Sequence, residues 1–138
     1  MLDTNVIVAS LKSARGASRR ILEQIGTGRF ELALSTPVLL EYEELFHRML
    51  PPLGVDPSSV IGILDVWASH SVLQDIHFLW RPFLPDREDD LMLELAFNAR
   101  CSHIVTFNLK DFRGIAELGI EAVTPGQFLQ LLEQEAAL

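Results

Sequence analysis

Short apolar runs alternate with segments of helical periodicity along most of the chain. This alternation is typical of an α/β domain, in which helices cross over between parallel strands. The expected strands are the N-terminal run that carries Asp3 and residues 30–35, 71–73, 102–107 and 121–123. The expected helices cover residues 17–27, 37–49, 57–69, 89–100 and 125–135, with a helical turn at 115–118 and an extended, proline-containing segment at 80–85. The pattern therefore predicts helices packed around a central parallel sheet.

The first eight residues combine one carboxylate with an apolar run. Met1-Leu2-Asp3-Thr4-Asn5 is followed at once by Val6-Ile7-Val8. A run of this kind predicts a buried strand that brings Asp3 to the edge of a sheet, where the chemistry of open parallel sheets collects. The alternative is that Asp3 caps a helix and Asn5 lies in a turn, because both residue types are common there. The further carboxylates in the chain favour the strand.

The chain has the size and composition of one domain, which we assign to residues 1–138. Hydrophobic residues make up 49% of the sequence, enough to build a core and too many for a disordered tail. No apolar run approaches the ~20 residues of a membrane span, and no leader resembles a signal peptide. The one cysteine, Cys101, excludes an internal disulfide and is expected to be a buried small residue. A reducing, cytoplasmic setting is therefore expected.

The net charge of −8 excludes one class of nucleic-acid binder. A protein that coats RNA or DNA by charge alone needs Lys and Arg side chains to neutralise phosphates. An enzyme that grips a phosphodiester through metal ions does not, and its metal-binding carboxylates would add to the negative charge. The basic residues Lys12, Arg15, Arg19 and Arg20 lie within nine positions. The first three could bind phosphates at the rim of a cleft, or they could form a solvated helix face.

Oxygen ligands occur at four places just beyond predicted strands. The candidates are Asp3, Glu41, the pair Asp89 and Asp90, and Asn108 with Asp111 close behind. A parallel sheet could bring all four places to one rim. Carboxylates crowded in one cleft repel one another and would take up protons unless a cation is present. Mg²⁺ or Mn²⁺ suits an all-oxygen site, and such an ion can activate water and clamp a phosphodiester.

Each of these candidates also has an ordinary structural explanation. Glu41 lies beside two further glutamates, as a solvated helix residue would. Asp89 and Asp90 open a helix, where the helix dipole favours acids in any case. Asn108 could be a turn residue. The four histidines are scattered without the spacing of metal ligands, so none of them is expected to be catalytic.

Four segments, in order along the chain, together resemble a PIN domain. They are LDTNVIV (Leu2 to Val8), STPVLLEYEELFHR (Ser35 to Arg48), PDREDDLMLELAFNA (Pro85 to Ala99) and HIVTFNLKDF (His103 to Phe112). Within that family, the chain most resembles the bacterial toxin components of toxin–antitoxin pairs. No single segment is strongly diagnostic, but four segments in register are specific.

The resemblance implies a three-layer α/β/α sandwich with a central parallel sheet and a metal-dependent ribonuclease activity. The acidic positions of the family fall on Asp3, Glu41 and Asp90. Asp89 competes with Asp90 for the third position. Asp90 lies sixteen positions before Thr106, and this spacing, which is usual in the family, favours Asp90.

The chain departs from the family pattern at the fourth acid. The family places that acid two residues after Thr106, where this chain has Asn108. Asn108 can still offer a carbonyl oxygen, but it carries no charge, so a second metal should bind more weakly. Asp111 could substitute if the loop folds back. Thr106 and Asn5 would hold the carboxylates by hydrogen bonds.

These observations lead to one main hypothesis and two alternatives. The main hypothesis is a PIN-domain endoribonuclease that hydrolyses RNA with Mg²⁺- or Mn²⁺-activated water, acts as a toxin, is inhibited by a small antitoxin protein and forms a homodimer. The first alternative is a PIN-like module that binds nucleic acid or protein with weak or no catalysis, which Asn108 and the acidic charge favour. The second is a flavodoxin-like regulatory domain, which would need Lys110 near the acid pocket.

Overall fold

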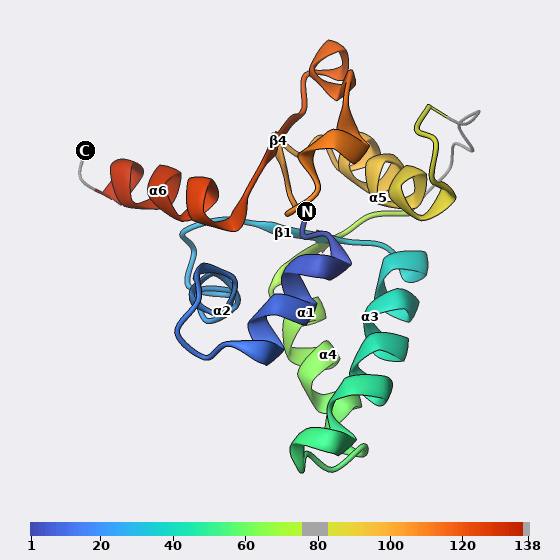
Figure 1. Ribbon diagram of the computed structural model, residues 1–138, viewed down its shortest axis with the longest axis vertical. Helices are drawn as coiled ribbons and strands as arrows, with labels where there is room; N and C mark the ends of the chain where they lie inside the picture. Colours follow the sequence, from blue (N-terminus) through green and yellow to red (C-terminus); the bar gives the residue numbers. More distant parts are fainter. Residues whose placement is uncertain (76–82, 137–138) are drawn as a thin grey trace.

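The structure, a computed structural model, describes residues 1–75 and 83–136 (Figure 1). Helices and short strands alternate along the chain, as the sequence predicts for an α/β protein. The helices are α1 (Thr4–Lys12), α2 (Ala17–Leu22), α3 (Thr36–Met49), α4 (Ser59–Ser69), α5 (Arg87–Asn98) and α6 (Pro125–Ala136), with 3₁₀ turns η1 (Pro51–Leu53), η2 (Leu109–Phe112) and η3 (Ile115–Leu118). The strands are β1 (Leu32–Leu34), β2 (Ser71–Leu73), β3 (His103–Val105) and β4 (Glu121–Val123).

The strands form two parallel pairs instead of one continuous sheet. Ala33 lies opposite Val72 in the β1–β2 pair, and Ile104 lies opposite Ala122 in the β3–β4 pair. Leu2 adds a single parallel bridge to Val105 of β3. The predicted parallel pairing is thus present, but within residues 1–75 and 83–136 the pairs do not join into the single central sheet that a three-layer sandwich requires.

The predicted N-terminal strand is reduced to the single bridge at Leu2, and the run from Thr4 onward is helical. α1 begins at Thr4, and Asp3 is its N-cap, with Oδ1 accepting a hydrogen bond of 2.8 Å from the Thr4 amide. Val6 and Ile7 are buried on one face of α1. β-Branched residues disfavour a helix by less than about 1 kcal/mol each, so burial of this face outweighs their strand propensity. The capping alternative for Asp3 is correct, whereas Asn5 lies inside α1 and not in a turn.

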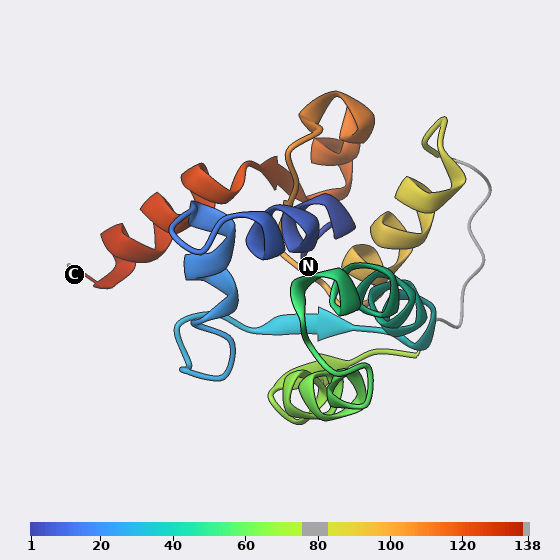
Figure 2. The same cartoon turned by 60° about the horizontal axis from the view of Figure 1, so that its bottom comes forward.

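α3 lies at the centre of the helical packing, because it contacts α1, α4 and α5. Its start follows the sequence signal: the Ser35 hydroxyl accepts an amide hydrogen bond and Pro37 occupies the first turn. Tyr42 and Phe46 pack edge-on against Trp67 of α4, with ring centroids 6.2 Å and 5.5 Å away. Figure 2 shows α3 and the neighbouring α4 nearly end-on, with α4 beneath β1.

The other predicted helices are present with shifted ends. α4 and α6 agree with the prediction to within about two residues. α5 begins at Arg87, earlier than predicted, because Asp86 caps it by accepting a 2.8 Å hydrogen bond from the Glu88 amide. α2 ends at Leu22, well before residue 27, and the chain turns at Gly26 with φ of 87°. The extended segment predicted at 80–85 falls largely outside the described residues.

No helix within the described residues is long and apolar enough to cross a membrane.

Candidate active site

Asp3 lies where the N-terminal residues leave β3 and α1 begins. Its backbone amide donates a 2.9 Å hydrogen bond to the Val105 carbonyl, and the residue is only 5% exposed. Oδ1 accepts the hydrogen bond of the Thr4 amide, and Oδ2 accepts one of 2.8 Å from the Thr106 hydroxyl. Oδ1 also accepts a long hydrogen bond of 3.5 Å from the Thr4 hydroxyl. Each carboxylate oxygen can accept two hydrogen bonds or ligands, so Oδ2 keeps a further acceptor position.

Thr106 connects Asp3 to the loop that follows β3. Its buried hydroxyl donates to Asp3 and accepts hydrogen bonds from Asn5 Nδ2 at 3.3 Å and from the Asn108 amide at 3.0 Å. Asn5 Oδ1 in turn accepts a 3.3 Å hydrogen bond from the Phe107 amide. The predicted support by Thr106 is therefore direct, while Asn5 acts on Thr106 and the loop instead of on a carboxylate.

The two neighbouring acids at the start of α5 have different surroundings. Asp90 Oδ1 accepts hydrogen bonds from the backbone amides of Phe83 at 3.2 Å and Leu84 at 2.9 Å. This carboxylate is thus used to hold the segment that precedes α5. Asp89, one residue earlier, is the acid that interacts with Asp3. The spacing in the sequence favoured Asp90, and the structure places the two acids differently because helix geometry turns adjacent side chains in different directions.

Asp89 lies among carboxylates that come from three separate parts of the chain. Burial is the largest cause that raises its pKa, and Asp3, Asp86, Asp111 and Glu88 raise it further by repulsion, to about 7. A carboxyl group with a pKa near neutrality is protonated in a large share of molecules at pH 7. Such a perturbation is common at functional sites, although structural clusters also produce it.

The pKa of Asp3 is also raised, by a balance of opposing effects. Burial is the largest cause, and the negative charge of Asp111 adds to it. The hydrogen bonds from Thr106 and Thr4 oppose the shift because they stabilise the ionised form. The charge of Asp111 in η2 therefore reaches both Asp3 and Asp89.

Glu41 borders this cluster from α3. It is half-buried, and its pKa is raised first by burial and then by the charges of Glu88 and Glu44. Glu88 also affects Asp89, so it links the two carboxylates across the contact between α3 and α5. We call Asp3, Glu41, Asp86, Glu88, Asp89 and Asp111 the acidic group.

Comparison with known families gives the class of protein. Residues 1–110 match the model of the PIN domain family. The chain belongs to the PIN domain family. This PIN domain carries Asp3, Glu41, Asp89 and Asn108 within the matched range, and Asp111 follows directly after it. No curated protein and no solved structure matches the chain significantly.

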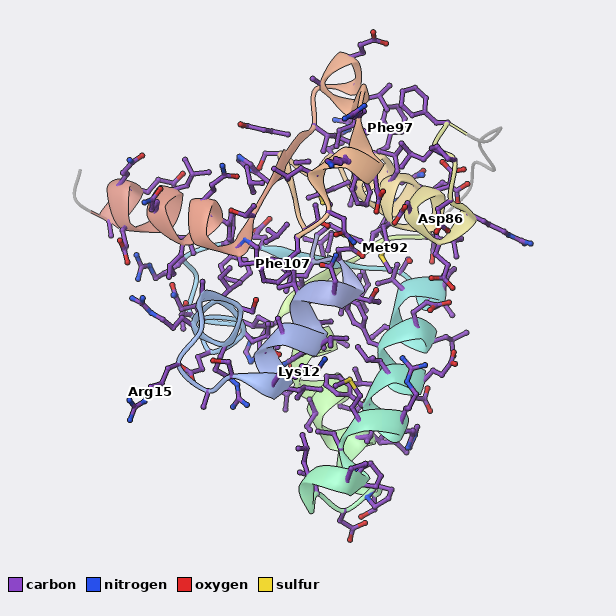
Figure 3. All side chains as sticks on the ribbon, viewed as in Figure 1. Lys12, Arg15, Asp86, Met92, Phe97 and Phe107 are labelled. Atoms are coloured by element: carbon purple, nitrogen blue, oxygen red, sulfur yellow. The ribbon has the colours of Figure 1, made fainter. Side chains whose placement is uncertain are left out.

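In this PIN domain, the basic residues predicted to bind RNA lie at or beyond the end of α1 that is opposite to Asp3. Asp3 caps the start of α1, whereas Lys12 ends the helix and Arg15 follows it, as Figure 3 shows. The nine residues of α1 correspond to about 13 Å along the helix axis. Arg19 is used internally, because its Nε donates a 2.9 Å hydrogen bond to the Ser10 carbonyl.

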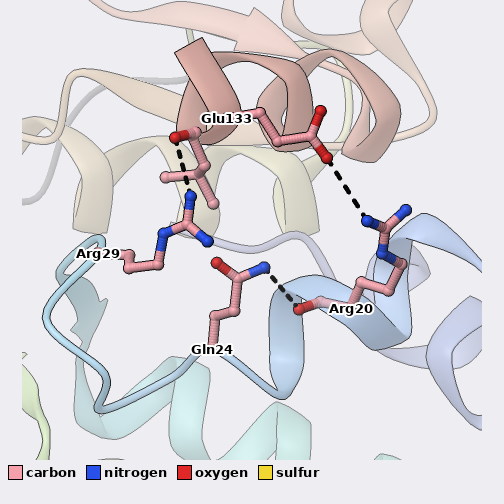
Figure 4. Close-up of polar contacts among 5 residues, drawn as sticks. Arg20, Gln24, Arg29 and Glu133 are labelled. Atoms are coloured by element: carbon pink, nitrogen blue, oxygen red, sulfur yellow. Dashed lines mark hydrogen bonds and ion pairs between the residues drawn. The ribbon is translucent and has the colours of Figure 1, made fainter. Parts of the chain in front are cut away.

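Other basic residues of the PIN domain hold α2 and the turn after it against α6 (Figure 4). Arg20 forms a 3.4 Å ion pair with Glu133, and Arg29 donates a 3.0 Å hydrogen bond to the Leu132 carbonyl. Gln24 donates a 3.1 Å hydrogen bond to the Arg20 carbonyl. The ion pair is exposed and contributes little to stability, so its main effect is to orient these side chains toward α6.

The sequence interpretation missed three residues that shape the site. Asp86 and Glu88 belong to the acidic group, and the spacing of three residues between Asp86 and Asp89 was the available signal. Tyr42 is fully buried, and its hydroxyl donates a hydrogen bond to the Leu2 carbonyl. That contact holds the residue before Asp3 in place, and only the packing of α3 against the N-terminus reveals it.

The acidic group has the chemistry that a hard divalent cation needs, but its side chains do not form a ready-made site. Within the described residues, no three His, Cys, Asp or Glu side chains are arranged to hold a metal ion. The donors are nevertheless all oxygens, and their mutual repulsion adds to the effect of burial in raising the pKa of Asp89. A cation would offset this repulsion, so the residues fit Mg²⁺ or Mn²⁺ by donor type and charge.

Proposed function

We propose that this PIN-domain protein is a metal-dependent endoribonuclease that hydrolyses RNA phosphodiesters. The observation that carries the proposal is the gathering of carboxylates from the start of α1, the start of α5 and η2 around Asp89, whose pKa is raised to about 7 by burial first and by their repulsion second. Crowding of this kind destabilises the fold unless a bound cation relieves it. The membership of the chain in the PIN family supports a nuclease-type function.

In this proposal, Asp3 and Asp89 are the central ligands, with Glu41 and Asp111 at their sides. A bound Mg²⁺ or Mn²⁺ would polarise the phosphodiester and lower the pKa of a water molecule that attacks it. The chain's own contribution is to fix the ligands: Thr106 and the cap of α1 hold Asp3 in one orientation. Asn108 follows Thr106 and offers a neutral carbonyl oxygen.

The proposal assigns the third acid to Asp89 instead of Asp90. Asp90 already accepts two backbone hydrogen bonds through Oδ1, so its role is to hold Phe83 and Leu84. No backbone amide of residues 1–75 or 83–136 donates to the Asp89 carboxylate, which lies close enough to Asp3 for their charges to interact. Ligation by Asp90 would require the segment before α5 to rearrange.

The biological role and the partners are a further step of the proposal. The resemblance of the four segments to bacterial toxin components supports a toxin whose RNA cleavage is blocked by a small antitoxin. A homodimer is expected for the same reason. These assignments are tested by growth arrest after expression, by its relief with a co-expressed neighbouring gene product, and by the mass of the protein in solution.

A binding module with weak or no catalysis is the second candidate. Two observations favour it: the neutral Asn108 follows Thr106, and the described carboxylates do not form a preorganised metal site. Such a protein would bind RNA or another protein through the same surface without hydrolysis.

The two functions are separated by Mn²⁺ titration calorimetry together with cleavage of a labelled single-stranded RNA. The variants are Asp3→Asn and Asp89→Asn, with Asp65→Asn on the exposed face of α4 as the matched control. Asn is as good an N-cap as Asp, so Asp3→Asn keeps α1 intact while it removes the charge.

If the protein is a nuclease, the wild type and Asp65→Asn should cleave RNA in the presence of metal. Asp3→Asn and Asp89→Asn should lose both metal binding and cleavage. RNA binding without cleavage at millimolar metal would establish the binding module and contradict the nuclease. Cleavage that survives in both Asp3→Asn and Asp89→Asn would place the active site elsewhere.

A further inference from the structure

Phe107 places a largely exposed aromatic ring directly after Thr106, the residue whose hydroxyl holds Asp3. Its exposed fraction is 50%, although the chain just before it is buried. Single exposed hydrophobic side chains are common on protein surfaces and need no function. Phe107 differs by its position, since Figure 3 shows it near the start of α1, at the other end of that helix from Lys12 and Arg15.

The backbone of Phe107 is held on both sides by the side chains that support the site. The Phe107 amide donates a 3.3 Å hydrogen bond to Asn5 Oδ1, and the Asn108 amide donates one of 3.0 Å to the Thr106 hydroxyl. That hydroxyl in turn donates to Asp3 Oδ2 at 2.8 Å. The backbone that carries the ring therefore keeps a fixed position relative to the carboxylate before any ligand binds. Such preorganisation lowers the entropic cost of binding.

The chemistry of the loop from Phe107 to Arg113 indicates what kind of ligand suits the ring. Lys110 and Arg113 are exposed, and neither forms an ion pair with a residue of 1–75 or 83–136. Asp111, the one acid of the loop, belongs to the acidic group. An apolar protein partner would need a wider hydrophobic patch than Phe107 and Leu109 offer. An aromatic ring with cations nearby is the combination that binds single-stranded nucleic acid, because bases stack on the ring and phosphates are attracted to the cations.

We propose that Phe107 is a stacking platform for one unpaired base of the RNA, next to the phosphodiester that the acidic group would receive. The inference rests on the proposed action on RNA. Stacking accepts every base, because each base has a flat π surface. A base inside a duplex is already stacked between its neighbours and must be extruded at a cost before it reaches the ring. Phe107 therefore selects unpaired RNA, in single strands, loops and bulges, without a preferred sequence.

Fluorescence of the RNA tests the contact directly. The probe is a short single-stranded RNA of alternating uridine and 2-aminopurine, a fluorescent base that is quenched when it stacks on an aromatic ring. The full chain is titrated in Ca²⁺, which takes the same kind of oxygen ligands as Mg²⁺, and the RNA is recovered afterwards to verify that it is intact. Phe107→Leu removes the ring but keeps an apolar side chain, and Phe107→Tyr keeps the ring. The matched control is Phe97→Leu, at a phenylalanine that is 41% exposed near the end of α5.

The wild type, Phe107→Tyr and Phe97→Leu should bind the RNA and quench its fluorescence. Phe107→Leu should bind about tenfold more weakly and without quenching, because the loss of one stacked base has an effect of this order. A complementary RNA strand should weaken binding to the wild type and have a much smaller effect on Phe107→Leu. Wild-type affinity or quenching in Phe107→Leu would overturn the proposal, as would an equal preference of both proteins for the single strand.

Two further readouts separate this inference from the proposed nuclease activity. Mn²⁺ binding by Phe107→Leu, measured by calorimetry, should equal that of the wild type, because Phe107 is not part of the acidic group. In cleavage of the single-stranded RNA, Phe107→Leu should raise KM with kcat unchanged, as expected for a residue that only binds the substrate.

The outcomes for the two proposals differ. Cleavage by Phe107→Leu with the wild-type KM would overturn the platform and leave the nuclease standing. Quenching that depends on Phe107, without any cleavage by the wild type in Mn²⁺, would support the platform and contradict the nuclease. Failure of the wild type to bind the RNA would overturn the platform whatever the Mn²⁺ titration shows.

Discussion

The Thr106 hydroxyl donates a 2.8 Å hydrogen bond to Asp3 Oδ2, although the two residues are 103 positions apart in the sequence. Both groups are buried, and the same hydroxyl accepts the Asn108 amide. One side chain thus holds the N-cap of α1, the end of β3 and the loop toward η2 in fixed relation. The orientation of the Asp3 carboxylate depends on this contact.

Replacing Thr106 by valine should destabilise the fold and raise the pKa of Asp3 further. The substitution keeps the side-chain shape but removes a donor to a buried carboxylate, at a cost of about 1–3 kcal/mol. Urea unfolding gives the free energy, and carbon-detected NMR of the carboxyl group gives the pKa. Thr27→Val, at an exposed position, is the control and should change neither quantity. An unaltered Asp3 pKa in Thr106→Val would show that the hydrogen bond is not formed in solution.

Because neighbouring acids repel one another, removing the charge of Asp111 should change the pKa values of both Asp89 and Asp3. Asp111→Asn should lower the pKa of Asp89 from about 7, because it removes one of the charges that raise it, and should lower that of Asp3 as well. The same carboxyl NMR titration measures both groups. Asp65→Asn, made on α4, should leave both pKa values as in the wild type. If Asp111→Asn also left them unchanged, the charge of Asp111 would not reach Asp3 or Asp89.

The raised pKa of Asp89 also predicts how the stability of the fold depends on pH. Its pKa in the folded protein is raised to about 7 from an ordinary value of 3.8, so the folded state binds this proton more tightly than the unfolded chain does. The stabilisation from this group is complete below about pH 4 and is lost progressively as the pH rises to about 7. Asp89→Asn should flatten the pH dependence of unfolding between these values. Addition of Mn²⁺ should raise the stability of the wild type most at the upper end of the range, because the ionised carboxylate is the ligand.

The hydrogen bonds of Asp90 predict a structural phenotype that differs from that of Asp89. Asp90→Ala should remove the acceptor of the Phe83 and Leu84 amides and increase their hydrogen exchange, with a loss of about 0.5–1.5 kcal/mol in unfolding free energy. Asp89→Ala should leave those amides protected. Exchange that rises equally in both variants would remove the distinction between the two acids.

The buried hydroxyl of Tyr42 should matter for the N-terminal residues. Tyr42→Phe keeps the aromatic packing on Trp67 but leaves the Leu2 carbonyl without this donor. We expect a loss of about 1–2 kcal/mol in unfolding free energy and faster exchange of the Asp3 amide. Wild-type exchange at Asp3 in this variant would mean that the β3 ladder alone holds the N-terminus.

Local signals in the sequence were sufficient for the elements whose ends and faces are set by neighbouring residues. The Ser35 cap and Pro37 fix the start of α3, and the helical spacing that includes Tyr42 predicts its buried face. The alternation of strands and helices likewise predicted parallel pairing. Four sequence segments were enough to suggest the PIN family, which the match over residues 1–110 confirms.

The tertiary structure decided the features that depend on distant partners. Val6 and Ile7 have strand propensity but form a helix, because burial of that face outweighs a propensity difference of less than about 1 kcal/mol per residue. Asp89 and Asp90 are adjacent in sequence and similar in composition, yet one approaches Asp3 and the other caps backbone amides. The spacing to Thr106 along the sequence could not distinguish the roles of these two acids, since the direction of each side chain is set by how α5 packs. Position along the chain thus identifies which residues can supply oxygen ligands, and the packing of the helices determines which of them meet.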